Sequence, residues 1–335
     1  MTLSLTSEVS LPTRLSTALE STWSAQAAVS AFDVQGHRGT RGWRPENTLP
    51  AFEYAIDLGV TTLELDTGIT ADGVVVVCHN PIISPKLCLS SSGQPLPRRP
   101  RLLIKNLTLA EVQAFDCGSL NPDPVNFPQQ QAVPGTFMPT LQQVFDLAEA
   151  KNPNIRYNIE SKINPLRPCE TVGPQTCAQK LVELITQNNL IERTNIQSFD
   201  WRVLWAVKSL NPAIRTSALV RQVKGKPGTL KSAPGMRSPF LAGLDFNQFE
   251  GNIAALLRAA GFIDRYSPNF ETLLPESPNF IQSVADLQEA GFPVIPWTVN
   301  DKPTMQQLID LGVDGLITDF PDILLELLHS RKQAL

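Results

Sequence analysis

The chain has 335 residues, of which 42% are hydrophobic and 18% are charged, and its formal net charge is −4. This composition excludes an intrinsically disordered chain, which combines low hydrophobicity with high net charge. It also argues against nucleic-acid binding and membrane insertion, because the sequence has no run of lysine and arginine and no apolar stretch near the roughly 20 residues of a membrane span.

Residues 1–30 lack the features of a clear secretory signal peptide. The start of the chain has no basic segment, and Glu8 and Glu20 interrupt its apolar character. We therefore expect an N-terminal arm over 1–30 and one domain over 31–335, with an atypical leader as the alternative. A soluble protein is predicted, and a cytoplasmic location is favoured over a periplasmic or secreted one.

Short apolar segments alternate with amphipathic ones over most of the chain. Strands are predicted at 32–36, 61–66, 74–79, 155–160, 194–199, 214–220, 262–267, 293–299 and 315–319. Helices are predicted at 49–58, 108–115, 140–150, 176–189, 201–209, 252–260, 280–290, 303–311 and 321–331. Regular alternation of strands and helices is typical of a parallel sheet, and about eight such units predict a (β/α)8 barrel, the TIM barrel.

The predicted strands exceed eight by one, and the segment 61–79 accounts for the excess. Asp72-Gly73 is a hairpin turn signal between two apolar runs, so 74–79 is expected to fold back antiparallel on the preceding strand. This turn would bring His79 beside Asp66, within cross-strand reach. Residues 80–139 then form a segment inserted after the second strand, and we expect it to cap a site.

Two of the three histidines follow predicted strands. His37 comes directly after the first strand, and His79 ends the strand that folds back. Both therefore lie where barrel enzymes carry their active sites, and we interpret them as catalytic residues. His329, near the last turn of a C-terminal helix, is interpreted as a helix-end or surface residue.

Three carboxylates are predicted to bind a metal ion. Glu64 and Asp66 alternate on one strand and so share a face, and Glu160 ends the next barrel strand. Buried ionised carboxylates need a cation, and oxygen ligands suit Mg²⁺ or Ca²⁺ better than Zn²⁺. The alternative is that Arg38 or Lys162 neutralises Glu64 or Asp66 in a buried salt bridge.

The positive charge expected at this rim indicates an anionic substrate. Arg38 and Lys162 together with a metal exceed the charge that three carboxylates require, so a phosphate is expected there, gripped by Arg38. His37 and His79 would supply a general base and a general acid. This constellation predicts metal-assisted cleavage of a phosphodiester.

Several short motifs follow one another in a fixed order between residues 32 and 328. They are His37-Arg38-Gly39, Pro45-Glu46-Asn47-Thr48, Glu64-Leu65-Asp66, Asp72-Gly73, His79, Glu160-Ser161-Lys162, Ser198-Phe199-Asp200, Trp297-Thr298-Val299-Asn300 and Thr318-Asp319. This series resembles the pattern of the glycerophosphodiester phosphodiesterase family. The resemblance implies a TIM barrel with a segment inserted after the second strand. It also implies hydrolysis of glycerophosphodiesters to an alcohol and glycerol 3-phosphate, with Mg²⁺ or Ca²⁺, as part of glycerophospholipid metabolism.

Carried over position by position, the resemblance implies the same roles for the residues discussed above and adds roles for three more. Glu46 would contact the metal sphere or the substrate hydroxyls, with a role in helix entry as the alternative. Trp297 would form a wall for the glycerol moiety, with simple packing as the alternative. Asn47 would help to order the helix start. Asn80 stands where the family commonly has aspartate, so this chain lacks there a carboxylate that could orient His79 or raise its basicity.

Three other functions fit the same residues. A lysophospholipase D or sphingomyelinase D would act on lipid phosphodiesters, a non-catalytic barrel would bind phosphodiesters, and a phosphoinositide-type lyase has a similar site. The preferred partner is a small-molecule glycerophosphodiester, with no nucleic acid and no membrane span, and the oligomeric state stays open.

The five cysteines give no CxxC spacing, so a zinc ribbon is not expected. Cys78 lies in an apolar run and is predicted to be a buried free thiol. Disulfides among Cys88, Cys117, Cys169 and Cys177 stay open, and Cys169 with Cys177 could close a small loop.

Overall fold

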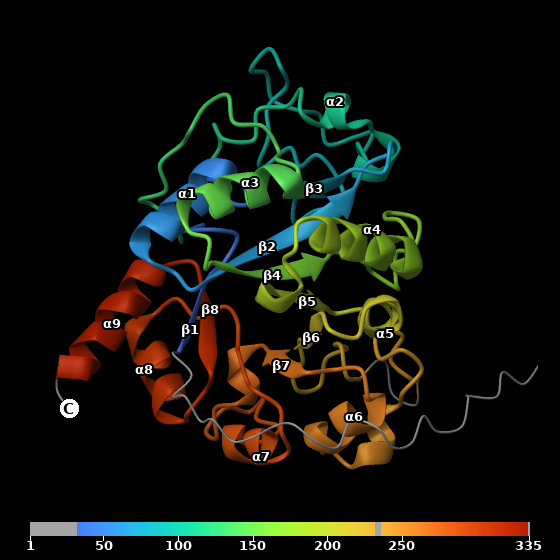
Figure 1. Ribbon diagram of the computed structural model, residues 1–335, viewed down its shortest axis with the longest axis vertical. Helices are drawn as coiled ribbons and strands as arrows, with labels where there is room; N and C mark the ends of the chain where they lie inside the picture. Colours follow the sequence, from blue (N-terminus) through green and yellow to red (C-terminus); the bar gives the residue numbers. More distant parts are fainter. Residues whose placement is uncertain (1–31, 232–235, 334–335) are drawn as a thin grey trace, which may run out of the picture. The chain divides into compact units, whose positions relative to one another are not determined.

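The computed structural model describes residues 32–231 and 236–333, so the predicted arm over 1–30 lies outside the described residues. Seven parallel strands form most of the barrel wall, in the spatial order β7-β6-β5-β4-β2-β1-β8 (Figure 1). They are β1 (Asp33–Gly36), β2 (Thr62–Ile69), β4 (Arg156–Ser161), β5 (Thr194–Ser198), β6 (Arg215–Val220), β7 (Arg265–Pro268) and β8 (Gly315–Thr318).

The eighth segment of the wall, residues 294–299, closes the barrel between β7 and β8. Val294 and Trp297 form parallel bridges to the β7 side, and the Val299 amide donates to the carbonyl of Ile317 on β8 at 3.0 Å. This segment was predicted as a strand over 293–299. It forms only isolated bridges because Pro293 and Pro296 have no amide hydrogen to donate to a ladder. The predicted TIM barrel is confirmed.

The helices lie around the outside of the strands (Figure 1). Helix α1 (Leu49–Leu58) has the bounds predicted for it, because Thr48 caps its first turn by accepting from the Ala51 amide and Gly59 ends it with a φ of 95°. Its buried face, which includes Phe52 and Ala55, packs into the barrel core. The other barrel helices are α3 (Leu141–Lys151), α4 (Pro174–Gln187), α5 (Trp201–Leu210), α6 (Ile253–Ala260), α7 (Val284–Glu289), α8 (Lys302–Asp310) and α9 (Pro321–Gln333). Across 32–231 and 236–333, no helix has the length and apolarity to cross a membrane.

Strand β3 (Val75–Val77) folds back on β2 as an antiparallel partner, as the Asp72-Gly73 turn predicted. Residues 80–139 follow it and contain the short elements η1 (Ile104–Asn106) and α2 (Leu109–Val112), drawn in teal to green in Figure 1. Together with residues of and next to β3, this inserted segment forms an apolar cluster separate from the barrel core. The cluster includes Val76, Ile83, Cys88, Ile104, Val112, Cys117 and Met138.

One disulfide, Cys88–Cys117, joins two parts of the inserted segment. Cys78 is buried and free, as predicted. The loop that Cys169 and Cys177 could have closed is not formed. Cys177 is on the buried side of α4, whereas Cys169 is exposed, so the two thiols lie in different surroundings.

Candidate active site

The three predicted metal ligands lie together on neighbouring strands. Asp66 of β2 is paired in register with Glu160 of β4, and Glu64 is on the same face of β2. One oxygen from each of the three buried carboxylates lies within 4.8 Å of the others. The period-two spacing on β2 and the parallel register together place these side chains at one point near the carboxyl ends of the strands.

Each carboxylate has a different set of partners. Glu64 accepts from the side chain of Gln197 at 2.7 Å and from the Arg38 amide at 3.0 Å. Asp66 accepts from the Asn47 side chain at 2.8 Å through Oδ2, whereas its buried Oδ1 accepts no hydrogen bond.

The alternative of buried salt bridges is partly realised. The Lys162 ammonium is 2.6 Å from Glu160 and 3.5 Å from Asp66, and the Arg38 Nε is 3.1 Å from Asp66. In contrast, Glu64 forms no ion pair with either Arg38 or Lys162. The two cations therefore neutralise only part of the cluster.

The charges at this site leave an excess of negative charge. The carboxylates of Glu46, Glu64, Asp66, Glu160 and Asp319 outnumber by two the three cationic side chains that contact them, Arg38, Arg41 and Lys162. A divalent ion would carry the balancing charge, and oxygen ligands with a free buried acceptor at Asp66 are suited to hold one. The residues present thus fit a divalent metal site.

Burial and mutual proximity shift the pKa values of the three carboxylates. Burial, together with Asp66 and Glu160, raises the pKa of Glu64 well above its usual value. Burial also raises the pKa of Glu160 to about 7, although Lys162 opposes it. Burial acts in the same direction on Asp66, but Lys162 and Arg38 outweigh it and hold the pKa of Asp66 well below its usual value. The cluster therefore binds protons near neutral pH unless a cation takes their place.

His37, directly after β1, is held by a carboxylate from the last strand. Its Nδ1 lies 2.7 Å from Oδ1 of Asp319, which follows β8, and its Nε2 is 4.0 Å from Glu64. Asp319 is itself fixed by the side chain of Asn300 at 2.7 Å and by Arg41 at 3.1 Å. Burial lowers the pKa of His37, and Asp319 opposes that shift.

Asp319 and Asn300 are part of this hydrogen-bonded group, although no role was predicted for them. Both lie in motifs of the family series, so the sequence contained the signal. The contact of Asp319 with His37, and through Asp319 that of Asn300, becomes visible only when β8 pairs with β1 and closes the ring.

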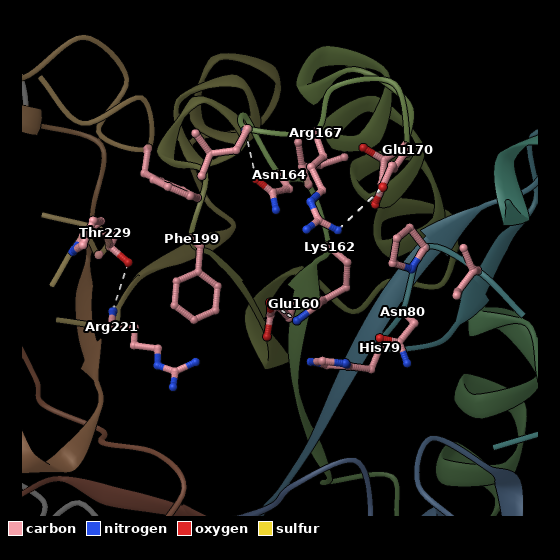
Figure 2. Close-up of a pocket in the computed structure, with 18 of the residues that line it drawn as sticks. His79, Asn80, Glu160, Lys162, Asn164, Arg167, Glu170, Phe199, Arg221 and Thr229 are labelled. Atoms are coloured by element: carbon pink, nitrogen blue, oxygen red, sulfur yellow. Dashed lines mark hydrogen bonds and ion pairs between the residues drawn. The ribbon is translucent and has the colours of Figure 1, made fainter. Parts of the chain in front are cut away.

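His79 reaches the same site from the other side. The Cys78 amide donates to the Asp66 carbonyl at 2.9 Å, which places His79 beside the carboxylates. Figure 2 shows its ring pointing toward Glu160 and Lys162 across the cavity. Within the described part of the chain the imidazole makes no hydrogen bond. Burial lowers the pKa of His79 to about 3, although Asp66 opposes the shift.

The loop between β1 and α1 supplies Arg38, Glu46 and Asn47. The Arg38 guanidinium donates to Glu46 at 2.8 Å, so Glu46 lies beside the three-carboxylate cluster and not within it. Asn47 has a φ of 57°, which asparagine tolerates better than most residues, and both of its side-chain atoms bond to Asp66. The role expected for Asn47 at the helix start is thus corrected: Thr48 caps α1, and Asn47 orients Asp66.

Trp297 packs against Phe199, with ring centroids 5.5 Å apart, and donates from its indole nitrogen to the Ser267 carbonyl. Phe199 in turn lies near Lys162, whose ammonium is 6.0 Å from the ring centroid. Trp297 therefore supports an aromatic wall beside Lys162.

Two cavities meet at His79 and Asn80. The larger has a volume of about 650 Å³ and extends from Glu160 and Lys162 past Phe199 to Arg221 (Figure 2). The smaller, of about 230 Å³, is lined by Arg38, Glu46 and residues of the inserted segment. A substrate with two substituents on one phosphate could place one in each.

Residues 37–323 match the model of the glycerophosphoryl diester phosphodiesterase family. The chain belongs to this family. This confirms the family predicted from the motif series, and it confirms that the protein is a glycerophosphodiester phosphodiesterase.

Similar proteins cover almost the whole chain. A glycerophosphodiester phosphodiesterase of Caldanaerobacter subterraneus is 28% identical over 296 residues, 88% of this chain and 97% of that protein. A lysophospholipase D of Homo sapiens is 26% identical over 302 residues, 88% of this chain and 85% of that protein.

Solved structures share the barrel. A crystal structure from Silicibacter pomeroyi, provisionally named a glycerophosphoryl diester phosphodiesterase, has a TM-score of 0.76 and 27% identity and covers 90% of this chain and 94% of that one. An Oleispira antarctica phosphodiesterase in complex with the product sn-glycerol-3-phosphate has a TM-score of 0.62 and 20% identity. The match covers 89% of this chain and 96% of that one.

Proposed function

We propose that this protein hydrolyses glycerophosphodiesters to an alcohol and glycerol 3-phosphate at the mouth of its barrel, with the residues named above in defined roles. The observation that carries the proposal is the buried trio Glu64, Asp66 and Glu160 flanked by His37 and His79. A protein that only bound phosphodiesters would not need two imidazoles placed on either side of such a cluster.

Glu64, Asp66 and Glu160 would hold one Mg²⁺ or Ca²⁺ ion, since all three offer hard oxygen ligands. When bound, this ion supplies positive charge that offsets the charge of the phosphodiester. Arg38 and Lys162 add to that charge as direct phosphate ligands. Both side chains already lie against the carboxylates, so they reach the phosphate without leaving the site.

His37 acts as the general base. Its bond to Asp319 keeps a proton on Nδ1, so Nε2 is free to accept one from the attacking oxygen, which belongs either to water or to the neighbouring glycerol hydroxyl. Asp319 then stabilises the imidazolium that forms, as a carboxylate partner does in other acid–base sites.

His79 acts as the general acid and protonates the leaving alkoxide. The pKa of His79, about 3, keeps the ring neutral in the free site, but a phosphate anion bound beside it favours the charged form and raises that pKa. Glu46 would contact the glycerol hydroxyls in the smaller cavity. Trp297 would support Phe199, which lines the larger cavity. This role differs from the one expected for Trp297, which was to form a wall for the glycerol moiety.

The test uses the purified full chain with glycerophosphocholine, with products identified by mass spectrometry. We expect glycerol 3-phosphate and choline, no turnover after exhaustive chelation, and recovery with Mg²⁺ or Ca²⁺. The variant Glu160→Gln should lose metal-dependent turnover, whereas Glu183→Gln, an exposed change on α4, should not. Full activity of the chelated enzyme would contradict the metal assignment, and the absence of any product under all conditions would contradict the function.

A further inference from the structure

The larger cavity has a basic end that the reaction described above does not use. Arg221 follows β6 directly, and Lys226 lies five residues further on in the same loop. Figure 2 shows the Arg221 side chain reaching into the cavity on the far side of Phe199 from Lys162. This end is therefore separated from the phosphate-binding residues by an aromatic ring.

The positive charge at this end is not neutralised by the protein. Among residues 32–231 and 236–333, neither the Arg221 guanidinium nor the Lys226 ammonium forms an ion pair or a hydrogen bond. Arg101 and Arg167 line the same cavity, but they share a single carboxylate, that of Glu170. Outside the catalytic cluster, the cavity thus has four cationic side chains and one acidic one.

The loop that carries Arg221 and Lys226 is held in a defined shape. Its Gln222 is buried and donates to the carbonyl oxygens of Val223 and Lys226, while its own oxygen accepts from the Lys231 amide. Arg221 and Thr229 exchange two further bonds at 3.0 and 2.9 Å.

Close packing supports the same shape. A Cβ atom at Gly228 would lie 2.4 Å from the Arg221 carbonyl oxygen, so only glycine fits there. The loop therefore presents its two cations to the cavity from a fixed backbone, which reduces the entropy cost of binding an anion there.

We infer that this enzyme prefers glycerophosphodiesters whose leaving alcohol carries a further negative charge, such as a second phosphate, and that Arg221 and Lys226 recognise that charge. The inference rests on the proposed function. The smaller cavity beside Glu46 takes the uncharged glycerol that all such substrates share, so the variable alcohol extends past Phe199 into the larger cavity. There it meets cations without counter-ions, which attract an anionic substituent and repel a quaternary ammonium.

The test compares glycerophosphoinositol with glycerophosphoinositol 4-phosphate, which differ only by one phosphate on the leaving alcohol. We expect kcat/KM to be at least tenfold higher for the phosphorylated ester at low ionic strength, because a charge-assisted bond is worth about that factor. The preference should shrink as salt is added. Arg221→Gln combined with Lys226→Gln should bring the ratio of the two kcat/KM values to within about twofold of unity.

Lys224→Gln is the matched control. It removes one positive charge from the same loop, but Lys224 faces a different hollow and does not line this cavity, so the ratio should stay as in the unaltered enzyme. Equal kcat/KM values for the two inositol esters would overturn the inference. So would hydrolysis of glycerophosphocholine with neither inositol ester accepted, or an equal loss of preference in the Lys224 variant. Failure to cleave any glycerophosphodiester would instead mean that the proposed function is wrong.

Discussion

The two histidine regions of this site differ in how firmly each imidazole is held. At the end of β1, His37 has a 2.7 Å bond to Asp319, which Asn300 and Arg41 fix in turn. At the end of β3, His79 lies beside Glu160 and Lys162 in an open cavity and has no hydrogen bond to any residue of 32–231 or 236–333. The His37 ring therefore has a fixed tautomer and orientation, whereas the surroundings of the His79 ring depend on the molecule bound in the cavity.

This difference is the basis on which we propose two separate roles, which the sequence could not distinguish. A general base benefits from a carboxylate behind it, since that carboxylate stabilises the charge the base acquires. A general acid must be charged before it acts, and His79 gains its proton most easily when an anionic substrate has arrived. If His37 is the prearranged base and His79 the substrate-dependent acid, the two imidazoles should respond differently to substitution and to a change of leaving group.

The largest effect is expected from removing each imidazole. His37→Ala and His79→Ala should each lower turnover of glycerophosphocholine by about 10²–10⁴-fold, the usual contribution of a general acid or base. The p-nitrophenyl ester of glycerol 3-phosphate separates the two, because its leaving group departs without needing a proton. His79→Ala should recover most of its activity on this ester, whereas His37→Ala should not.

His329→Ala, an exposed change on α9, is the matched control, and thermal unfolding of all three variants checks that the fold is retained. Equal recovery of both active-site variants on the p-nitrophenyl ester would remove the distinction between base and acid. Recovery in His37→Ala alone would reverse the assignment.

A smaller loss is expected when the support of His37 is weakened. Asp319→Asn should lower kcat/KM by about 10–100-fold, the range seen when the hydrogen-bonding partner of an essential ligand or base is removed. Asp319 raises the pKa of His37, so the variant should have a lower pKa there. His37 must be unprotonated to act as a base, and the acidic limb of the kcat/KM profile should therefore move to lower pH.

The ratio of activities on the p-nitrophenyl and choline esters reports on His79 and should not change in Asp319→Asn. A change in this ratio, with the acidic limb left in place, would show that Asp319 acts on the whole site and not through His37.

The fold was predictable because its signals are local. The cap at Thr48 and the glycine at Gly59 determine α1, and the Asp72-Gly73 turn determines the β2–β3 hairpin. The expected helix over 108–115 begins with its capping box but ends at Val112, because the chain then turns so that Asp116 pairs with Leu89. That pairing lies inside the insertion and has no periodic pattern to reveal it.

The site was predictable only where its residues are neighbours in sequence or on adjacent strands. Glu64 and Asp66 share a face by alternation, and the turn brings His79 to them. The bond between His37 and Asp319 joins residues 282 positions apart and depends on barrel closure. Arg221 stands in a loop without a motif, so its place in the cavity needed the three-dimensional structure.

The smallest effect is expected in the pH dependence of metal binding, which involves the carboxylates between the two histidines. Without metal, the pKa of Glu160 is raised to about 7 and that of Glu64 is also raised, so the folded protein binds protons there that the unfolded chain releases at lower pH. Such groups stabilise the fold below their unfolded pKa, and this stability is lost as pH rises through the folded pKa. A divalent ion restores this stability by replacing those protons, so the increase in Tm on adding Mg²⁺ or Ca²⁺ to chelated enzyme should grow between pH 5 and pH 8.

Glu160→Gln has no such proton to lose. The increase in Tm that the metal causes in this variant should therefore be smaller and should depend less on pH. An equal shift at pH 5 and pH 8 in the unaltered enzyme would mean that the ion binds without displacing protons from these carboxylates, and the three would then not be its ligands.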